Sequence, residues 1–354
     1  MISPSFISNL YRTYRRMVTV STLGSHCALQ VLKGAKDEGL DTLLVCEKRR
    51  LPLYRRFPFI DKLVPVDAFS DILESPHSEM LKDTILIPHG TLIAQMSPDV
   101  IESIEARIFG NRNILRWEAD RSLKEKLMRA AGLPLPETID SPDQISDMVI
   151  VKRQGAAGGK GYFMASTPEE FYRRRDLLVQ AKTISPDEPL YIQRYIPGVL
   201  AYLQFFYSPL KDQTEYFGCD QRHESDIEGL GRIPASSQPD SMVPSFNVIG
   251  NTPIVLRESL LAGAYDMAEN FVKASASLVR PGMNGPFCIE GVYDADANFY
   301  AFEFSARIVA GTSIYMEGSP YYNLLFGEPI SMGRRISREI KEAAETDRLD
   351  DITT

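Results

Sequence analysis

A strand pair near the C-terminus constrains the fold more than any other feature of the sequence. It lies in the stretch PFCIEGVYDADANFYAFEFSARIVAG, residues 286–311. Two mostly apolar runs, residues 287–293 and 299–304, flank the segment DADAN, whose Asp and Asn side chains are typical of turns. We therefore expect an antiparallel hairpin in which Glu290 lies directly opposite Glu303. Side chains in such a pair have Cβ atoms about 5 Å apart.

Two carboxylates this close together need positive charge between them. Mg²⁺ suits the position, because it takes carboxylate oxygens and keeps its other positions for water and nucleotide phosphates. Two other arrangements stay open: one glutamate is turned to solvent, or Arg307 forms an ion pair with one of them. The hairpin thus predicts a metal site on Glu290 and Glu303.

The stretch VKRQGAAGGKGYFMAS, residues 151–166, has the composition of a phosphate-binding loop but fits neither of two common patterns. Lys160 stands where a Walker loop has its second glycine, and no G-x-G-x-x-G spacing opens a helix. Strands are expected on both sides, so the loop is interpreted as a flap over phosphates. Its glycines allow close backbone approach, and Lys152 and Lys160 supply positive charge. A flexible hairpin tip is the alternative.

The first part of the chain predicts an α/β domain. A strand at residues 17–21, the turn LGSH, the helical pattern ALQVLKGAKDEG and a strand at 42–46 make a βαβ unit. The N-terminus of its helix presents free N–H groups to an anion. Further strands are expected at 62–66 and 84–88, and the loop after the second lies where parallel sheets bind ligands. We assign residues 1–118 to this domain.

Two further domains are expected, at residues 119–198, which include the glycine flap, and at residues 199–354, which are rich in strands. In the first we expect helices at 120–131 and 168–179 and strands at 148–152, 162–165 and 190–195. In the second we expect the hairpin, strands at 202–207 and 215–219, and a helix at 257–278. Residues 334–344 have the charge pattern of a surface helix followed by a frayed acidic tail.

Composition and charge exclude several classes of protein. The chain has 44% hydrophobic and 24% charged residues, the balance of a water-soluble globular protein, and its net charge of −8 argues against nucleic acid as a partner. We find neither an apolar run that could span a bilayer nor the apolar segment of a signal peptide, so we expect no membrane association. Four widely spaced cysteines predict reduced core residues of a cytoplasmic protein: Cys27, Cys46, Cys219 and Cys288.

The strand lysine, the glycine flap and the carboxylate hairpin ending in E-x-S-x-R together resemble the ATP-grasp superfamily of ligases. Longer stretches, among them STLGSHCALQVLKGAKDEG, IPHGT, FGNRNILRWE, VIGNTPIVLRESLL and FEFSARIVAGT, resemble the formate-dependent phosphoribosylaminoimidazolecarboxamide ligases, the 5-formaminoimidazole-4-carboxamide ribonucleotide synthetases. The resemblance runs from about Leu10 to the C-terminus. It implies a chain of α/β and α+β parts, with an ATP-grasp fold that holds ATP between two subdomains and a Rossmann-like domain before it.

The resemblance implies an enzyme of purine (IMP) biosynthesis. It would formylate the 5-amino group of 5-aminoimidazole-4-carboxamide ribonucleotide, using formate and splitting ATP to ADP and phosphate. Formate would first become formyl phosphate, which the amine then attacks. Mg²⁺ or Mn²⁺ on Glu290 and Glu303 would neutralise charge during phosphoryl transfer, and Arg307 would stabilise the acyl phosphate. Arg307 and Glu303 are the catalytic residues on this reading.

The binding residues of the family map onto matching positions of this sequence. The expected ribonucleotide contacts are Ser25, His26, Thr91 and Asn251. The expected ATP contacts are Lys152, Gly155, Gly158, Gly159, Lys160, Gly161, Gln193, Arg194, Tyr195, Ile196 and Glu224. Thr91 keeps the hydroxyl of the usual serine, whereas Ser305 replaces the asparagine of the usual E-x-N-x-R motif. The resemblance also suggests a homo-oligomer.

One departure from the family lies at Gln193 and Arg194, where the family tends to carry acidic residues. Backbone contacts to adenine tolerate this change, whereas an acidic contact to the nucleotide does not. Two alternatives to the formate ligase therefore stay open. One is a non-catalytic nucleotide-binding paralogue, and the other is an ATP-grasp ligase for another small acid and amine.

Overall fold

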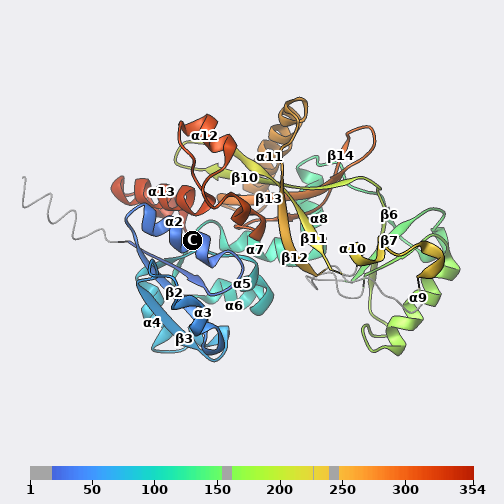
Figure 1. The fold of residues 1–354 in the computed structure, drawn as a ribbon, viewed down its shortest axis with the longest axis horizontal. Helices are drawn as coiled ribbons and strands as arrows, with labels where there is room; N and C mark the ends of the chain where they lie inside the picture. The colour runs from blue at the N-terminus through green and yellow to red at the C-terminus, as the bar shows by residue number, and fades with distance from the viewer. Residues whose placement is uncertain (1–17, 154–161, 226, 239–246) are drawn as a thin grey trace, which may run out of the picture.

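The computed structural model describes residues 18–153, 162–225, 227–238 and 247–354 of the chain. It contains three sheets, which lie in successive parts of an elongated molecule (Figure 1). The N-terminal part lies at one end, and the part that carries α9 (Pro168–Gln180) lies at the other. The large sheet that includes β10 (Val199–Ser208) and β13 (Gly285–Tyr293) lies between them.

The N-terminal part is a five-stranded parallel sheet of order β3-β2-β1-β4-β5. Its elements are β1 (Thr19–Leu23), α2 (Ala28–Asp37), β2 (Asp41–Glu47), η1 (Lys48–Arg50), α3 (Leu51–Tyr54), β3 (Lys62–Val66), η2 (Phe69–Leu73), α4 (His77–Lys82), β4 (Thr84–Leu86), α5 (Gly90–Gln95), α6 (Pro98–Ser103), β5 (Arg107–Ile108) and α7 (Arg112–Ala119). The predicted βαβ unit is confirmed, and β1 lies at the centre between β2 and β4. Because the carboxyl ends of parallel strands share one edge, the turn after β1 and the loop after β4 lie close together.

The second part is a four-stranded antiparallel sheet of order β6-β9-β7-β8. Its elements are β6 (Thr138–Ile139), η3 (Pro142–Gln144), β7 (Val149–Arg153), β8 (Phe163–Ala165), α9 (Pro168–Gln180) and β9 (Leu190–Arg194), and α8 (Arg121–Ala130) precedes them. The glycine stretch joins β7 to β8, which pair antiparallel, as expected for a loop between two strands. Residues 154–161 themselves lie outside the described residues.

The third part is a five-stranded antiparallel sheet of order β12-β11-β10-β13-β14. Its elements are β10 (Val199–Ser208), β11 (Gln213–Glu224), α10 (Ile227–Leu230), η4 (Ala235–Ser237), β12 (Val248–Ile254), α11 (Glu258–Leu278), β13 (Gly285–Tyr293) and β14 (Phe299–Ser305). Glu290 lies opposite Glu303 across β13 and β14, so the predicted pairing of the two glutamates is confirmed, and the register shifts by one residue between Glu290 and Gly291. On the other face of the sheet Phe271 of α11 stacks on Phe287 at 5.5 Å between ring centroids.

The C-terminal elements contradict one sequence prediction. They are η5 (Ala310–Tyr315), α12 (Pro320–Phe326), α13 (Met332–Glu345) and α14 (Leu349–Ile352). Helix α13 is not a surface helix but packs against α2, where the glycines Gly34 and Gly333 let the backbones touch: a Cβ on Gly34 would lie 2.2 Å from the carbonyl carbon of Gly333. The tail is not frayed either, because Thr354 exchanges two backbone hydrogen bonds of 3.0 Å with Ile108 of β5.

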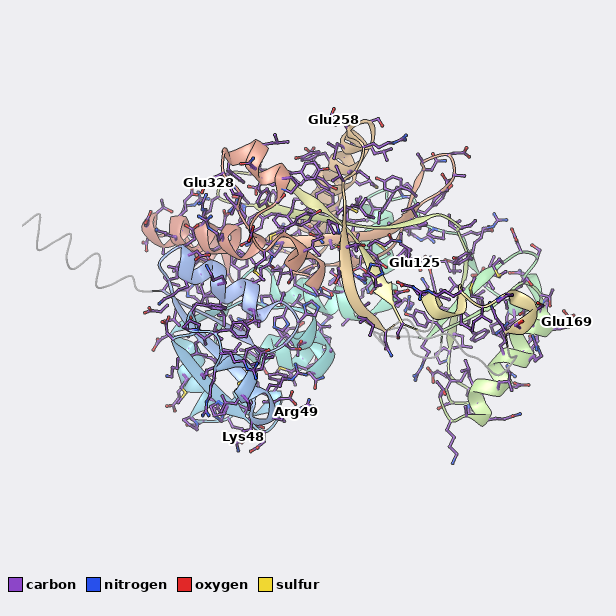
Figure 2. All side chains as sticks on the ribbon, in the orientation of Figure 1. Lys48, Arg49, Glu125, Glu169, Glu258 and Glu328 are labelled. Carbon is purple, nitrogen blue, oxygen red and sulfur yellow. The ribbon has the colours of Figure 1, made fainter. Side chains whose placement is uncertain are left out.

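The charged residues of α13 explain why its pattern was misread. Arg335 is buried and forms ion pairs of 2.8 Å with Glu215 of β11 and with Glu339. Arg338 is half-buried and pairs at 2.8 Å with Glu328, which lies near α12 (Figure 2). Charges that satisfy one another inside the protein look the same in a sequence as charges that face water.

The cysteines agree with the expectation of reduced core residues. Cys27, Cys46, Cys219 and Cys288 are all buried and carry free thiols. Among the described residues, none of the helices combines the length and the apolar character needed to cross a bilayer.

Candidate active site

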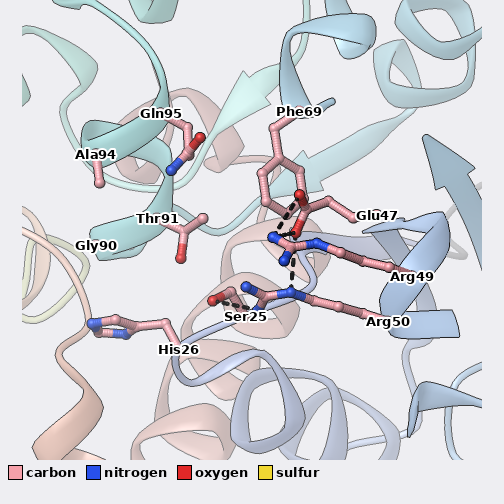
Figure 3. Close-up of a pocket in the computed structure, with 10 residues that line it drawn as sticks. All are labelled: Ser25, His26, Glu47, Arg49, Arg50, Phe69, Gly90, Thr91, Ala94 and Gln95. Carbon is pink, nitrogen blue, oxygen red and sulfur yellow. Dashed lines mark hydrogen bonds and ion pairs between the residues drawn. The ribbon is translucent and has the colours of Figure 1, made fainter. Parts of the chain in front are cut away.

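A pocket of about 310 Å³ lies at the carboxyl edge of the N-terminal sheet (Figure 3). The residues that line it are Ser25, His26, Glu47, Arg49, Arg50, Phe69, Gly90, Thr91, Ala94 and Gln95. The turn after β1 supplies Ser25 and His26, and the first turn of α5 supplies Thr91. The structure therefore brings three of the four predicted ribonucleotide contacts into one pocket.

The turn after β1 has a backbone that few residues permit. A Cβ on Gly24 would lie 2.6 Å from the Cβ of Cys46, so only glycine lets the turn pass this close to β2. His26 has a φ of +55°, in the left-handed region that non-glycine residues rarely adopt. Helix α2 starts two residues later, at Ala28, so its amino end follows directly after the pocket-lining residues Ser25 and His26.

Three charged side chains gather on one wall of the pocket (Figure 3). Arg50 donates to the Ser25 hydroxyl at 3.0 Å and pairs with Glu47 at 3.0 Å. Arg49 donates to both carboxylate oxygens of Glu47, at 3.0 and 2.9 Å. Two guanidinium groups against one carboxylate leave a net positive charge, which suits an anionic ligand. Sequence reasoning missed this wall, because the run KRR after β2 resembles any solvated basic turn.

Two histidines stack beside the pocket, with 5.4 Å between the ring centroids of His26 and His89. His89 is buried; its Nε2 lies 2.8 Å from the Leu23 carbonyl oxygen, and its Nδ1 accepts from the Thr91 N–H at 3.2 Å. Burial lowers the pKa of His89 to about 4, and burial together with Arg307 lowers the pKa of His26 to about 2. Both rings are therefore neutral near pH 7, and His26 can donate or accept a hydrogen bond but is too weak a base to hold a proton there.

The two glutamates of the hairpin each face a positive side chain from a different part of the fold. Arg222 of β11 pairs with Glu290 at 2.8 Å, and Lys124 of α8 pairs with Glu303. Burial tends to raise the pKa of Glu303, but Lys124 more than offsets this effect and holds that pKa at about 2. Glu303 is therefore ionised at any working pH.

Ser305, which stands where the usual motif has asparagine, contacts a glutamate of the hairpin. Its hydroxyl donates to Oε1 of Glu290 at 2.9 Å, and the side chain is buried. In the described part of the chain, no cluster of three or more His, Cys, Asp or Glu side chains is arranged to hold a metal. Two carboxylates and a hydroxyl nevertheless fit Mg²⁺ or Mn²⁺, which keep positions for phosphate oxygens and water.

Lys152 is buried on β7 and donates from Nζ to Oε1 of Gln193 at 2.8 Å. The Nζ also lies 5.3 Å from the centroid of the Phe302 ring. Burial, with a smaller contribution from Arg121, lowers the pKa of Lys152 to about 8. Gln193, one of the two residues that depart from the family, is therefore the direct partner of this lysine.

The other expected ATP contacts near β9 lie at its end. Arg194 is exposed and pairs with Asp147 at 3.4 Å and with Glu137 at 3.7 Å. Tyr195 is exposed, and Ile196 is half-buried. The five expected contacts of the flap, Gly155, Gly158, Gly159, Lys160 and Gly161, lie outside the described residues.

Asn251 does not line the pocket that holds His26. It lies on β12 and donates to Asp220 of β11 at 2.6 Å, and Gln204 donates to the other oxygen of the same carboxylate at 2.5 Å. Burial raises the pKa of Asp220. Glu224 lies further along β11, and burial raises its pKa as well, against the opposing effect of Arg222.

Arg307 connects the pocket with the hairpin. Its Nη2 pairs with Glu118 of α7 at 2.9 Å, not with either hairpin glutamate. A Cβ placed on Gly90 would lie 3.5 Å from the same Nη2 and 2.8 Å from Nε2 of His26, so these groups are neighbours. Sequence reasoning missed Glu118, Lys124 and Arg222. The first stands in the stretch FGNRNILRWE, and the others occur in helical and strand patterns that gave no sign of an ion pair.

Comparison with known proteins identifies the family of the chain. Two family models match, one described as a domain of unknown function (DUF1297) over residues 170–354 and one as a protein of unknown function (DUF1246) over residues 20–139. The chain is 68% identical over 341 residues to the 5-formaminoimidazole-4-carboxamide-1-(beta)-D-ribofuranosyl 5'-monophosphate synthetase of Cenarchaeum symbiosum, covering 96% of this chain and 100% of the relative. It is 45% identical to the protein of the same name from Methanocaldococcus jannaschii, with 99% of each covered.

Solved structures agree with the sequence relatives. The IMP biosynthesis protein PurP from Thermococcus kodakaraensis has a TM-score of 0.76 and 33% identity, covering 95% of this chain and 100% of that one. The N5-carboxyaminoimidazole synthetase of Staphylococcus aureus, solved with ADP, has a TM-score of 0.62 at 12% identity, with 90% and 78% covered, and shows the fold alone. The predicted resemblance is confirmed: the chain belongs to the family of 5-formaminoimidazole-4-carboxamide ribonucleotide synthetases, ATP-dependent ligases with the ATP-grasp fold.

Proposed function

We propose that the chain joins formate to the 5-amino group of 5-aminoimidazole-4-carboxamide ribonucleotide, splitting ATP to ADP and phosphate. The observation that carries the proposal is the position of Arg307. It follows the carboxylate hairpin directly in the chain, and its guanidinium lies beside His26 at the pocket. A phosphorylated acid held near the hairpin would therefore meet a nucleotide held in the pocket.

The pocket would bind the ribonucleotide with its 5′-phosphate against the positive wall. Arg50, the Ser25 hydroxyl and the N–H groups at the start of α2 supply donors there. Thr91 adds a hydroxyl on the opposite element, α5. Neutral His26 would hydrogen-bond the base or ribose without adding charge. Asn251 would contact the ligand from the sheet side.

The reaction would take place in two steps. A formate oxygen attacks the γ-phosphorus of ATP, the bond to the β,γ-bridging oxygen breaks, and ADP leaves. The 5-amino nitrogen then attacks the formyl carbon, the carbon–oxygen bond to phosphate breaks, and the nitrogen loses a proton as inorganic phosphate departs. Arg307 would hold the acyl-phosphate oxygens during both steps, because it is a permanent positive charge with several donors.

The ATP would lie between the second and third sheets. Lys152 would contact its phosphates from β7, and the glycine flap, including Gly155, would close over them. Residues 193–196 and Glu224 would contact the base and ribose. Glu290 and Glu303 would hold Mg²⁺ or Mn²⁺, which supplies charge neutralisation to the phosphates when bound. We also propose the domain limits 1–118, 119–198 and 199–354, a cytoplasmic location and a homo-oligomeric assembly.

ADP release measured while each substrate is omitted in turn tests the proposal. The purified chain with Mg²⁺ should release ADP only when formate and the ribonucleotide are both present. Tight ribonucleotide binding without ADP release would support the non-catalytic paralogue instead. Release of ADP with bicarbonate or acetate at equal concentration, and not with formate, would show a ligase for another acid.

A further inference from the structure

Glu118 makes two contacts with the segment that follows the carboxylate hairpin. One carboxylate oxygen, Oε1, pairs with Nη2 of Arg307 at 2.9 Å. The other, Oε2, accepts a hydrogen bond from the backbone N–H of Ala306 at 2.8 Å. Each carboxylate oxygen of Glu118 thus binds one of two consecutive residues. Ala306, the first of them, lies 188 positions after Glu118 in the chain.

This position is unfavourable for a carboxylate on other grounds. Glu118 is only 5% exposed, so its charge loses most of its hydration. It is also the last residue but one of α7, where the helix dipole disfavours negative charge. An apolar side chain would pack there without either cost, so the stability of the helix does not explain the glutamate. Its contacts with Ala306 and Arg307 do.

Among the described residues, Glu118 is the one charged partner of the Arg307 guanidinium. Nη2 is occupied by Glu118, and Nη1 donates to its neighbour Ile308 at 3.3 Å. The Nε atom is buried and has no partner among the described residues. The hairpin carboxylate Glu303 is paired with Lys124, and Arg307 is paired with Glu118.

We propose that Glu118 is a positioning residue for formyl transfer, which holds the Arg307 guanidinium between the ribonucleotide pocket and the hairpin. This role rests on the proposed function, because it assigns Arg307 to the acyl phosphate. Glu118 itself contacts neither ligand. Its contribution is to fix a side chain that would otherwise choose among several rotamers and carboxylates.

The substitution Glu118→Gln separates positioning from folding. The glutamine oxygen can still accept the Ala306 N–H, so the link between α7 and the end of β14 is kept. Its NH₂ group faces Arg307 as a second donor, so the ion pair is lost. We expect kcat to fall about 100-fold, the cost of a misplaced catalytic group. The KM for ATP should stay close to the wild-type value, whereas the melting temperature should fall because Arg307 loses its buried charged partner, and Glu118→Asp should restore most of that fall.

A double-mutant cycle with Arg307→Met decides whether Glu118 acts through Arg307. If it does, Glu118→Gln has no further effect on kcat once Arg307 is gone, so the double variant equals the single Arg307→Met variant. Additive losses in the cycle would overturn the proposal. Glu118→Asp, which keeps the charge on a shorter side chain, should recover part of the kcat lost in Glu118→Gln. If the melting temperature instead falls by a similar amount in Glu118→Gln and in Glu118→Asp, the role of Glu118 is structural.

Glu102→Gln is the matched control. Glu102 of α6 pairs with Arg116 of α7 at 2.8 Å, so the variant removes a more exposed ion pair of the same helix, outside the site, and leaves Arg116 its second partner Asp99. Its kcat should equal the wild-type value. If wild-type ADP release proves independent of formate or of the ribonucleotide, the proposed function fails. The same cycle, measured with whichever substrates do release ADP, still decides the role of Glu118, so the two failures are distinct.

Discussion

The contact between Lys152 and Gln193 predicts a measurable pH dependence of ATP use. The pKa of Lys152 is lowered by burial from 10.5 to about 8. Its positive charge is therefore present below pH 8 and is lost as the pH rises through that value. Because the charge would bind ATP phosphates, kcat/KM for ATP should fall above pH 8. The substitution Gln193→Glu places a carboxylate where the amide oxygen now lies, 2.8 Å from Nζ.

The size of the shift follows from the burial and the distance. An opposite charge within a few ångströms moves a pKa by about 1 to 3 units. The new carboxylate is itself buried, which offsets part of the attraction, so we expect a shift of about 1.5 units. At pH 9 about one tenth of Lys152 is protonated in the wild type and about three quarters in the variant. The ratio of kcat/KM at pH 9 to kcat/KM at pH 7 should therefore be about eightfold higher in the variant than in the wild type.

The assay is initial-rate ADP release at limiting ATP between pH 6.5 and 10, with formate and the ribonucleotide saturating. Normalising each enzyme to its own value at pH 7 removes any repulsion between the introduced carboxylate and ATP that does not depend on pH. Gln180→Glu adds the same charge at the exposed end of α9 and should leave the wild-type profile unchanged. If kcat/KM for ATP in Gln193→Glu still falls near pH 8, or falls at a lower pH, the decrease is not caused by deprotonation of Lys152.

Three further predictions follow from single contacts. Arg50→Gln should raise the KM for the ribonucleotide about tenfold and leave the KM for ATP unchanged, because a charge-assisted contact to phosphate is worth about 1.5 kcal/mol; equal effects on both would contradict the pocket assignment. Glu303→Gln should abolish ADP release and weaken Mn²⁺ binding in the presence of ADP, measured by electron paramagnetic resonance; unchanged Mn²⁺ affinity would exclude Glu303 as a ligand. Arg335→Met leaves Glu215 buried without its partner and should lower the free energy of unfolding by about 3 to 5 kcal/mol, measured by urea denaturation, with kcat little changed at room temperature.

The parts of the fold that sequence reasoning predicted well are those decided by neighbouring residues. The turn DADAN brings β13 and β14 together, and Glu290 lies opposite Glu303 as expected, although a register shift between Glu290 and Gly291, which the sequence does not indicate, is part of this pairing. The ends of β3 agree with the prediction residue for residue, because Asp61 and Asp67 flank the run. Helix α9 begins at Pro168 after the capping Thr167, which is a local signal too.

The parts that sequence reasoning missed depend on contacts between distant segments. Arg50 reaches Ser25 because β1 and β2 are adjacent in the sheet, and a run of basic residues contains no sign of that neighbour. The pairing of Lys124 with Glu303 joins residues 179 positions apart. The hydrogen bond from Asn251 to Asp220 joins two neighbouring strands, and the sequence does not indicate it.

The ion pairs around the hairpin depend on α7 and α8, the two helices that precede the second sheet. Glu118 near the end of α7 and Lys124 in α8 lie close together in the chain, and Asp120 between them caps the start of α8 by accepting from the Leu123 N–H at 2.9 Å. This corner therefore supplies one partner to Arg307 and one to Glu303. Without it Glu303 would lose its ion-pair partner Lys124, and Arg307 would lose Glu118 and be free to turn toward Glu303. The E-x-S-x-R motif thus becomes a working site only when the α7–α8 corner is packed against it, which explains why so short a motif is not sufficient to define the chemistry.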